Sequence, residues 1–532
     1  MSFRAAVVAV AALAPATAYA QSPAPRDSNL VVRAVEVRRY DIFAPSEANT
    51  FYARAANGLH ITTGPRVVRR ELLFRTGEPY DSARVAETAR NLRSLGIFRL
   101  VAIDSIRTDS GLVVRVTTGD GWSTRPLFNI QSTGGTFTPT IGVEELNFLG
   151  TATLASIRYR SDPDRSTVTT VFRQPRLFAG RVGVTFLYAH LSDGDIGQAQ
   201  LAKPFFSLSG RTSWQVGGDV RNHRILRFFD GSDQARDTLR HRATLGYAAA
   251  AWALRAGPSG YFRLGISGQV LREDFADDAR ADTIGRTVRG AAGPFLQWRR
   301  ARFLVSRGLQ GFAREEDIDV STSVGLGLTL APRAFGYDDD GIVPYLTLLT
   351  GFGRPGAFVQ LTAIAEGRYT SAGLDSGAVH LAGTAYFQPG PRHLAVLHGS
   401  VGWMERPAPG AEFDLGGIRG GPRGIRDHYF TGDRAFFTSA EYRFTVTNDF
   451  LKLTAIGLAG WADYGGAWYG GTPRRAKGSI GAGLRFGPTR ATDTRSSRVD
   501  VACRNREDDG QFRCLLVIGQ GFAFPITGRL DR

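Results

Sequence analysis

One stretch of the sequence combines several glycines with an unusual number of arginines. Residues 414–434 carry four arginines, namely Arg419, Arg423, Arg426 and Arg434. If such a loop folds into a protein interior, its cations need acidic partners, because an unpaired buried charge is costly. Glu441 and Asp463, which follow the loop in the sequence, are the candidate partners. The chemistry expected here is structural ion pairing.

The residue types that usually carry catalysis or bind metals form no recognisable motif. The eight histidines are scattered, and the chain contains neither an H-E-x-x-H sequence nor a cluster of cysteine and histidine. It also lacks a G-x-S-x-G nucleophile elbow and a phosphate-binding loop. We therefore expect no enzymatic activity, no cofactor and no metal site.

The two cysteines of the chain, Cys503 and Cys514, are spaced for a disulfide. Ten residues centred on Asp508 and Asp509 separate them. If those aspartates form the turn of a hairpin, the cysteines lie directly opposite each other, within disulfide reach. Such a bond suits an oxidising compartment. We expect the disulfide, in an exported protein.

After the first 120 residues, apolar and polar side chains alternate with a period of two. On the predicted strand 435–446, Glu441 and Arg443 share one face, and Tyr442 lies on the other. Asp463 is an acid in an otherwise apolar stretch. Because one face of such a strand must be apolar, both acids are expected to point away from it, into the lumen of a barrel.

Segments of about ten residues with this alternation recur to the end of the chain, separated by turn clusters such as 161–164 and 338–341. This pattern is typical of a transmembrane antiparallel β-barrel. Allowing roughly 25 residues for a strand and its share of the turns, residues 121–532 hold about 16 strands. The alternatives are an array of soluble β-sandwiches or a propeller. The lack of a fixed repeat period and of linkers disfavours both.

The composition agrees with this class. Of the 532 residues, 43% are hydrophobic and 21% are charged, and the mean hydropathy is −0.15. These values argue against a disordered chain and a bundle of membrane helices, whereas a barrel averages its two faces to a neutral value. The net charge of +16 comes from arginines spread singly through the chain. Without a nucleic-acid-binding module, we expect no nucleic-acid partner.

The first 120 residues follow a different plan. Arg4, the apolar stretch 5–13 and the sequence Ala18-Tyr19-Ala20 are typical of a signal peptide over residues 1–20. Residues 21–29 are expected to be a linker, and residues 30–120 a small α+β domain of order β-α-α-β-β. Its expected elements are a strand at 31–40, helices beginning near Pro65 and Asp81, and strands at 99–106 and 112–118.

Four stretches, in the correct order, resemble one known family. Residues 59–103, with a helix ending in REL-L-F and a closing L-x-x-L-G-I-F, resemble a polypeptide-transport-associated (POTRA) domain. Residues 120–150 are similar to the entry into the barrel of the BamA/TamA-like outer-membrane assembly family. FDLGGIRGGPRGIRDHYFTGDRAFFTSAEYRF (413–444) and WADYGGAW (461–468) resemble that family's inward loop and the strand after it.

The resemblance implies a role for the arginine-rich loop. The segment 413–434 would fold into the barrel, held there by a short motif. That motif comprises Arg423, Gly424 and Ile425. In the family, the arginine of the motif pairs with both acids, which correspond here to Glu441 and Asp463. The alternative is that the three charges in the lumen are unrelated.

The sequence departs from the family in two places. Pro422 and Ile425 stand where the family prefers valine and an aromatic residue, and Arg419 competes with Arg423 for the role of the loop arginine. In addition, only one POTRA domain fits before residue 121, whereas well-known members carry several.

The resemblance implies an outer-membrane protein of a Gram-negative-type bacterium, with its POTRA domain in the periplasm. Its function would be to assist assembly, insertion or translocation of other polypeptides. Expected partners are outer-membrane lipid and lipopolysaccharide, unfolded polypeptides bound by the POTRA edge strand, and a periplasmic or inner-membrane accessory protein. The first and last barrel strands, near 127–133 and 515–524, would form a weak seam. The alternative is a passive channel or surface structural barrel without clients.

Overall fold

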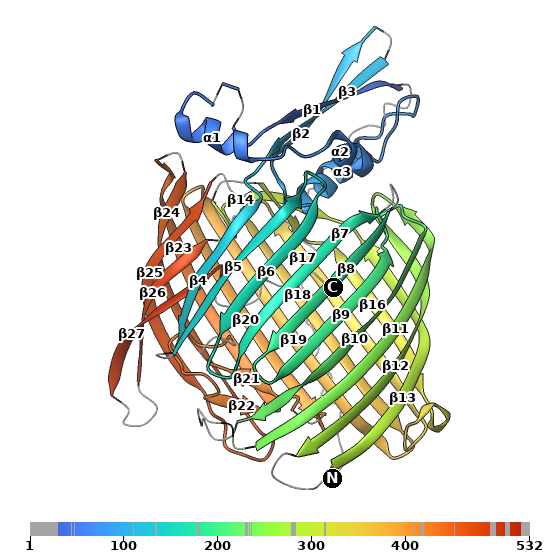
Figure 1. Ribbon diagram of the computed structural model, residues 1–532, viewed down its shortest axis with the longest axis vertical. Helices are drawn as coiled ribbons and strands as arrows, with labels where there is room; N and C mark the ends of the chain where they lie inside the picture. Colours follow the sequence, from blue (N-terminus) through green and yellow to red (C-terminus); the bar gives the residue numbers. More distant parts are fainter. Residues whose placement is uncertain are drawn as a thin grey trace.

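The protein is mainly β, with one large antiparallel sheet and a small α+β domain at one end of it (Figure 1). The computed structural model describes residues 30–522 except 44, 47, 110, 134–135, 178–180, 229–231, 233–234, 236, 278–282, 313–314, 409, 417–419, 452, 490–495 and 506–510. The predicted signal peptide and linker lie outside these residues. In the part of the chain so described, no helix is long and apolar enough to cross a membrane.

The N-terminal domain comprises β1 (Val32–Tyr40), α1 (Phe51–Leu59), α2 (Pro65–Glu71), α3 (Ser82–Ser94), β2 (Phe98–Thr108) and β3 (Gly111–Asp120). The large sheet comprises β4 (Thr124–Thr133), β5 (Thr136–Phe148), β6 (Thr153–Ser161), β7 (Ser166–Leu177), β8 (Val182–Leu191), β9 (Gly194–Lys203), β10 (Thr212–Arg227), β11 (Asp237–Gly257), β12 (Gly260–Asp277), β13 (Thr283–Arg300), β16 (Thr322–Ala331), β17 (Gly341–Arg354), β18 (Ala357–Thr370), β19 (Gly373–Gly390), β20 (His393–Glu405), β23 (Arg434–Phe450), β24 (Thr454–Trp468), β25 (Lys477–Pro488), β26 (Ser497–Asn505) and β27 (Phe512–Gln520). Two small hairpins, β14 (Phe303–Arg307) with β15 (Glu315–Asp319) and β21 (Phe413–Leu415) with β22 (Phe430–Gly432), and a 3-10 turn, η1 (Arg333–Phe335), complete the described elements.

In the N-terminal domain, helices α2 and α3 share one core with the three-stranded sheet. The sheet has the order β1-β3-β2, with β1 parallel and β2 antiparallel to the central β3. Val32, Val68, Leu92 and Val114 are fully buried between the sheet and helices α2 and α3. Asp81 caps α3 by accepting hydrogen bonds from the first backbone amides of the helix. The predicted strands and both predicted helices are present.

The predicted order β-α-α-β-β is wrong by one helix. Helix α1 lies between β1 and α2, so the order is β-α-α-α-β-β. Its sequence contains the poor helix formers Asn57 and Gly58 and has no acidic residue in the first turn. The Thr50 hydroxyl caps the helix, and Ala53 packs beside Ile42 in a small core of its own. That packing, which local propensity does not report, stabilises α1.

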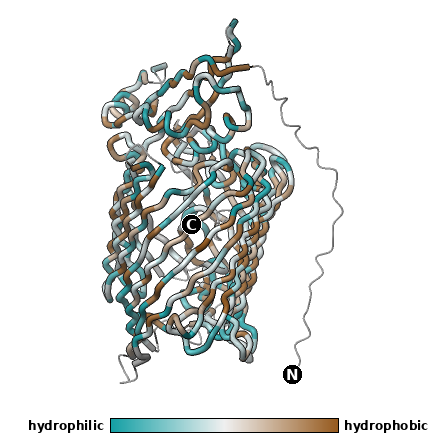
Figure 2. Tube along the Cα trace, turned by 90° about the vertical axis from the view of Figure 1, so that its right-hand side faces the viewer, coloured by the Kyte–Doolittle hydropathy of each residue, from teal (hydrophilic) through white to brown (hydrophobic). Residues whose placement is uncertain are grey.

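The large sheet contains 20 strands and curves round into a barrel (Figure 1). The predicted number of about 16 is therefore too low, because a strand with its share of turns takes about 20 residues here and most turns are short. Apolar and polar residues alternate along the strands (Figure 2). Phe186 and Tyr188 on β8 and Leu264 and Ile266 on β12 are exposed on the outer surface, as the period of two predicts.

The two ends of the sheet meet at β4 and β27. Among the described residues, these strands pair antiparallel at Ile518 and Ser132, whereas each pairs with its other neighbour along its whole length. Strand β27 ends at Gln520, short of the predicted Phe524. Gly521 has a φ of 65°, and the Phe522 side chain after it is buried inside the barrel. Counting described residues, the contact between β4 and β27 is the least paired junction of the sheet.

The N-terminal domain sits on the end of the barrel that we call the near end; the opposite end is the far end (Figure 1). The Arg176 guanidinium on β7 donates to both carboxylate oxygens of Glu71, at 3.0 and 3.1 Å. Burial raises the pKa of Glu71, and Arg176 opposes this shift. Arg93 on α3 donates to both carboxylate oxygens of Asp317 on β15, at 2.6 and 2.7 Å. These two-pronged pairs fix the orientation of the domain.

The hairpin β14–β15, which connects β13 to β16 at the near end, folds back into the barrel. Leu304 and Ile318 of the hairpin are buried with Phe358 and Val396 of the barrel strands and with Phe522. Burial of one such side chain contributes roughly 1.5–3 kcal/mol. The hairpin is therefore a packed part of the barrel interior, and nothing in the sequence pattern predicts it.

Candidate functional site

The segment between β20 and β23 enters the barrel from the far end. Its ends form the hairpin β21–β22, in which Leu415 pairs with Phe430. Ile425, Tyr429 and Phe430 are buried against Ala467 of β24. The described part of the segment is thus packed on the inner wall of the barrel.

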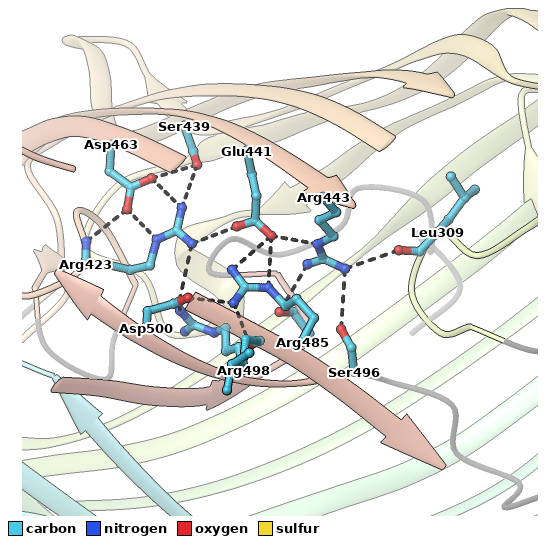
Figure 3. Close-up of polar contacts among 12 residues, drawn as sticks. Leu309, Arg423, Ser439, Glu441, Arg443, Asp463, Arg485, Ser496, Arg498 and Asp500 are labelled. Atoms are coloured by element: carbon cyan, nitrogen blue, oxygen red, sulfur yellow. Dashed lines mark hydrogen bonds and ion pairs between the residues drawn. The ribbon is translucent and has the colours of Figure 1, made fainter. Parts of the chain in front are cut away.

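Arg423, in this segment, lies between the two acids that the resemblance assigns to it (Figure 3). Its Nε and Nη2 donate to the two carboxylate oxygens of Asp463, at 2.7 and 2.9 Å, and its backbone N–H donates to Asp463 Oδ2 at 3.1 Å. Its Nη1 donates to Glu441 Oε2 at 2.7 Å. The Arg423 side chain is only 2% exposed, and the side chains of both acids are fully buried.

One indole ring completes the surroundings of Arg423. The guanidinium carbon lies 3.8 Å from the centre of the Trp461 ring. A guanidinium over an aromatic face gains about 2 kcal/mol or more when it is shielded from water. The Ser439 hydroxyl donates to Asp463 Oδ1 at 2.7 Å. The Trp461 ring therefore covers the Arg423–Asp463 ion pair, and the Ser439 hydroxyl adds a hydrogen bond to its carboxylate. Further contacts of this kind offset the cost of removing both charges from water.

The ion-pair network extends beyond the three predicted residues (Figure 3). Arg443 Nε and Arg485 Nη2 lie 2.6 and 3.2 Å from Glu441 Oε1. Arg485 Nη1 donates to Asp500 Oδ1 at 2.6 Å, and Arg498 Nη1 lies 3.4 Å from Asp500 Oδ2. The network thus joins β23, β24, β25 and β26 to the inward segment.

The structure brings together Arg423, Glu441 and Asp463, the three residues that the resemblance pairs; Asp500 and the arginines of β25 and β26 were not predicted. A weak signal for Asp500 existed: Arg498 and Asp500 stand two apart in β26, as Glu441 and Arg443 do in β23. Charges spaced by two on a strand share a face and point into the lumen together. No comparable signal distinguishes Arg485 from the other arginines of the chain.

Gly424, the second residue of the predicted motif, passes close to the barrel wall. It has a φ of 83°, and a Cβ added there would lie 3.0 Å from the Ala502 Cβ on β26. The Arg504 Nε–H donates to the Gly424 carbonyl oxygen. A side chain at position 424 would therefore be strained and would push the segment away from β26.

The remaining predicted residues are placed as follows. Ile425 has no exposed surface. Cys503 and Cys514 form a disulfide between β26 and β27. They lie opposite each other at the far end, next to Arg504; the predicted turn at Asp508 and Asp509 lies outside the described residues. Arg419, the alternative loop arginine, also lies outside them.

A second contact of the segment is made by His428. Its Nδ1 lies 2.7 Å from Asp414 Oδ2, and its Nε2 lies 2.9 Å from Asp164 Oδ1 in the turn between β6 and β7. The ring stacks on Phe228, with 3.4 Å between ring centres. Burial disfavours the charged ring, but the hydrogen bonds to Asp164 and Asp414 outweigh this and raise the pKa of His428 to about 9.

This raised pKa predicts a pH dependence. Because the pKa of His428 is higher in the folded protein than the usual value of 6.5, its stabilising contribution is full below about pH 6.5 and is lost as the pH rises to about 9. The difference corresponds to about 3 kcal/mol in the free energy of unfolding. We expect His428→Asn to remove this loss, as measured by urea unfolding in detergent between pH 6 and 9.5. His190→Asn, at an exposed histidine, is the control. An unchanged pH dependence in His428→Asn would contradict the assignment.

Within the described ranges, no group of three or more histidine, cysteine, aspartate or glutamate residues could hold a metal ion. The ion pairs and hydrogen bonds of the site hold one chain segment to the barrel wall.

No family profile matches the sequence, and no curated protein matches it. Among solved structures, CdiB from Escherichia coli has a TM-score of 0.48 and 12% identity, over 92% of this chain and 75% of that one. CdiB from Acinetobacter baumannii has a TM-score of 0.41 and 11% identity, over 92% and 72%. BamA from Haemophilus ducreyi lacking POTRA domains 1–3 has a TM-score of 0.38 and 11% identity, over 91% and 83%. Because all three TM-scores are below 0.5, we draw no conclusion about function from these structures.

Proposed function

We propose that this protein is a non-enzymatic outer-membrane barrel that assists the assembly, insertion or translocation of other polypeptides. The observation that carries the proposal is a barrel interior occupied from both ends, next to a junction that is barely paired. Residues 420–432 fill it from the far end, and β14–β15 fills it from the near end.

The occupied interior is unfavourable for a passive channel. A wide pore needs a continuous aqueous path, but the near-end hairpin packs Leu304 and Ile318 against inward-facing barrel residues. At the far end, Arg423 and His428 hold the inward segment to separate parts of the wall. Both obstacles are stabilised by buried contacts, so neither opens without a cost.

The junction of β4 and β27 offers a different route. In the described part of the chain, the facing edges of these two strands share one register pair, Ile518 with Ser132, and one side-chain contact, from the Ser132 hydroxyl to the Leu516 carbonyl oxygen at 3.2 Å, so the two edges are sparsely paired. Such edges bind further strands readily, because each unpaired group gains a hydrogen bond. A client strand could therefore pair with β4 or β27 and enter the membrane sideways.

The N-terminal domain, a POTRA domain by resemblance, supplies a second binding edge. Its sheet order leaves β2 at an edge, and no described strand pairs with the outer side of β2. The outer side of β1 is partly covered, because Val32 N–H donates to the Glu78 carbonyl. Strand β2 would capture unfolded clients through backbone hydrogen bonds, with little preference for sequence.

In this proposal the near end faces the periplasm and the far end the cell exterior. The Cys503–Cys514 disulfide then lies on the oxidising outer side. The partners are lipid and lipopolysaccharide around the barrel, unfolded polypeptides at β2, and a periplasmic or inner-membrane accessory protein. No cofactor enters the proposal.

Deleting residues 30–120 tests the client-handling role. We expect the folded levels of other outer-membrane proteins to fall, because the capture edge is lost. Levels are measured by heat-shifted electrophoresis of isolated outer membranes, which also reports the amount of the truncated barrel itself.

The double variant Glu71→Gln/Asp317→Asn is the matched control. It retains the domain and removes its two-pronged ion pairs with the barrel. We expect it to retain most of the client handling. Normal levels of other outer-membrane proteins, with the truncated barrel folded in normal amount, would favour the passive channel or structural barrel instead.

A further inference from the structure

Helix α1 presents an apolar face to the surroundings. Phe51 is 81% exposed and Leu59 is 79% exposed, the two highest values among the large apolar side chains of the described chain. With 3.6 residues per turn, Phe51, Tyr52, Ala55 and Leu59 fall on one side of the helix. Ala53, on the opposite side, is fully buried. An ordinary surface helix shows the reverse arrangement, so this face is suited to a non-aqueous partner.

The position of α1 is fixed by its packing. Ala53 belongs to a core cluster with Ile42 and Phe43, and Trp122 packs against that cluster. Trp122 stands two residues before the start of β4, so α1 lies beside the near end of this strand. Figure 1 shows α1 just above the near-end rim of the barrel, at one side of the N-terminal domain.

Apolar side chains continue from α1 onto the outside of the barrel. On β4 the outward-facing residues include Phe128, which is 72% exposed. The strand segment from Trp122 to Pro126, the first exposed apolar residue of β4, spans about 13 Å. At the near-end turn between β23 and β24, Leu451 is 73% exposed. Exposed apolar residues thus lie on α1, on the outside of β4 and at the near-end turn between β23 and β24.

We propose that the exposed face of α1 lies in the interfacial layer of the lipid leaflet at the near end, beside the junction of β4 and β27. This rests on the membrane location in the proposed function, but not on client handling. The exposed Arg54 at the edge of the face can reach lipid phosphates while Phe51 and Leu59 enter the acyl boundary. An aromatic and aliphatic face bordered by arginine is typical of helices that lie on a membrane.

A spin label at Leu59 tests the proposal. Both native cysteines of the chain are in the disulfide, so Leu59→Cys introduces one labelling site. The full-length protein is reconstituted in vesicles of phosphatidylethanolamine and phosphatidylglycerol. Collision rates of the nitroxide are then measured with oxygen, which concentrates in lipid, and with a water-soluble nickel chelate.

Two control positions provide reference collision rates, one for lipid and one for water. Leu397→Cys, on the outside of β20, is 60% exposed and reports barrel lipid. Asp109→Cys, in the turn between β2 and β3, reports water. We expect the ratio of oxygen to nickel collisions at position 59 to be several-fold higher than at 109 and to approach that at 397.

The measurement distinguishes failure of this proposal from failure of the proposed membrane location. A water-like ratio at 59 with a lipid-like ratio at 397 would overturn the proposal and leave the membrane barrel intact. Water-like ratios at both positions would overturn the membrane location itself. Low collision rates with both reagents at 59 would mean that protein, such as a second copy of this chain, covers the face, and would also overturn it.

Discussion

Replacing Arg423 with alanine should release the inward segment and raise the conductance of the reconstituted barrel in planar bilayers. Among the described residues, Arg423 is the only cation within ion-pair distance of Asp463. Glu441 would keep Arg443 and Arg485 as partners. The loss therefore falls on Asp463, which would remain buried and charged. Its other donors are the Ser439 hydroxyl and the backbone N–H of residue 423, and the backbone donor is lost when the segment is released. Leaving one buried charge without its partner costs about 3–5 kcal/mol.

The inward segment itself offers a matched control. Arg426 stands three residues after Arg423, and its described contact is a ring, with the guanidinium carbon 5.5 Å from the centre of Tyr429. Arg426→Ala removes the same side chain without removing an ion pair described in the structure. We expect its conductance and its unfolding free energy in detergent to stay near the wild-type values. Equal effects of the two substitutions would show that Arg423 has no special anchoring role.

A second substitution separates anchoring from stability. In Arg423→Ala/Asp463→Asn the unpaired carboxylate is gone, so part of the lost unfolding free energy should return. The segment still lacks its anchor, so the conductance should remain high. If the double variant restored both quantities, the ion pair would not be what holds the segment in the barrel.

Linking β4 to β27 covalently should abolish client insertion. Ser132 and Ile518 face each other across the junction, so cysteines at these positions can form a disulfide. The bond would prevent the two strands from separating, and a client strand could no longer pair with their edges. Insertion of a radiolabelled outer-membrane protein into proteoliposomes, measured by protease protection, should fall to background and return after mild reduction.

The matched control uses the same first cysteine. Ser132→Cys with Phe137→Cys links β4 to β5, which are already paired along their length. This link leaves the junction with β27 free, so insertion should proceed normally. Wild-type protein treated with the reductant accounts for the loss of the native disulfide. Full activity of the oxidised Ser132–Ile518 variant would exclude a sideways route through this junction.

The positions of the predicted residues show which side-chain orientations the local sequence pattern can predict. Glu441 and Arg443 were assigned to the inner face from alternation alone, and both are buried while Tyr442 between them is 48% exposed. The assignment needs only the geometry of one strand, in which successive side chains point to opposite sides. Pairing Arg423 with Glu441 and Asp463 needed more, since the three lie on different elements, and it came from the family resemblance.

The features that the sequence did not predict depend on contacts between distant segments. Asp500 meets Arg485 because of the register of β25 against β26, and the register between two strands does not follow from either strand alone. The inward hairpin β14–β15 is stabilised by burial against β18 and β20, and α1 by Trp122.

By itself the sequence determined a mainly β chain with a small α+β domain at its start, because side-chain periodicity is a local property. Only the tertiary structure decided the number of strands, the two segments that occupy the barrel, and the full set of partners around Arg423. These depend on which strands become neighbours and on what is left to be buried between them.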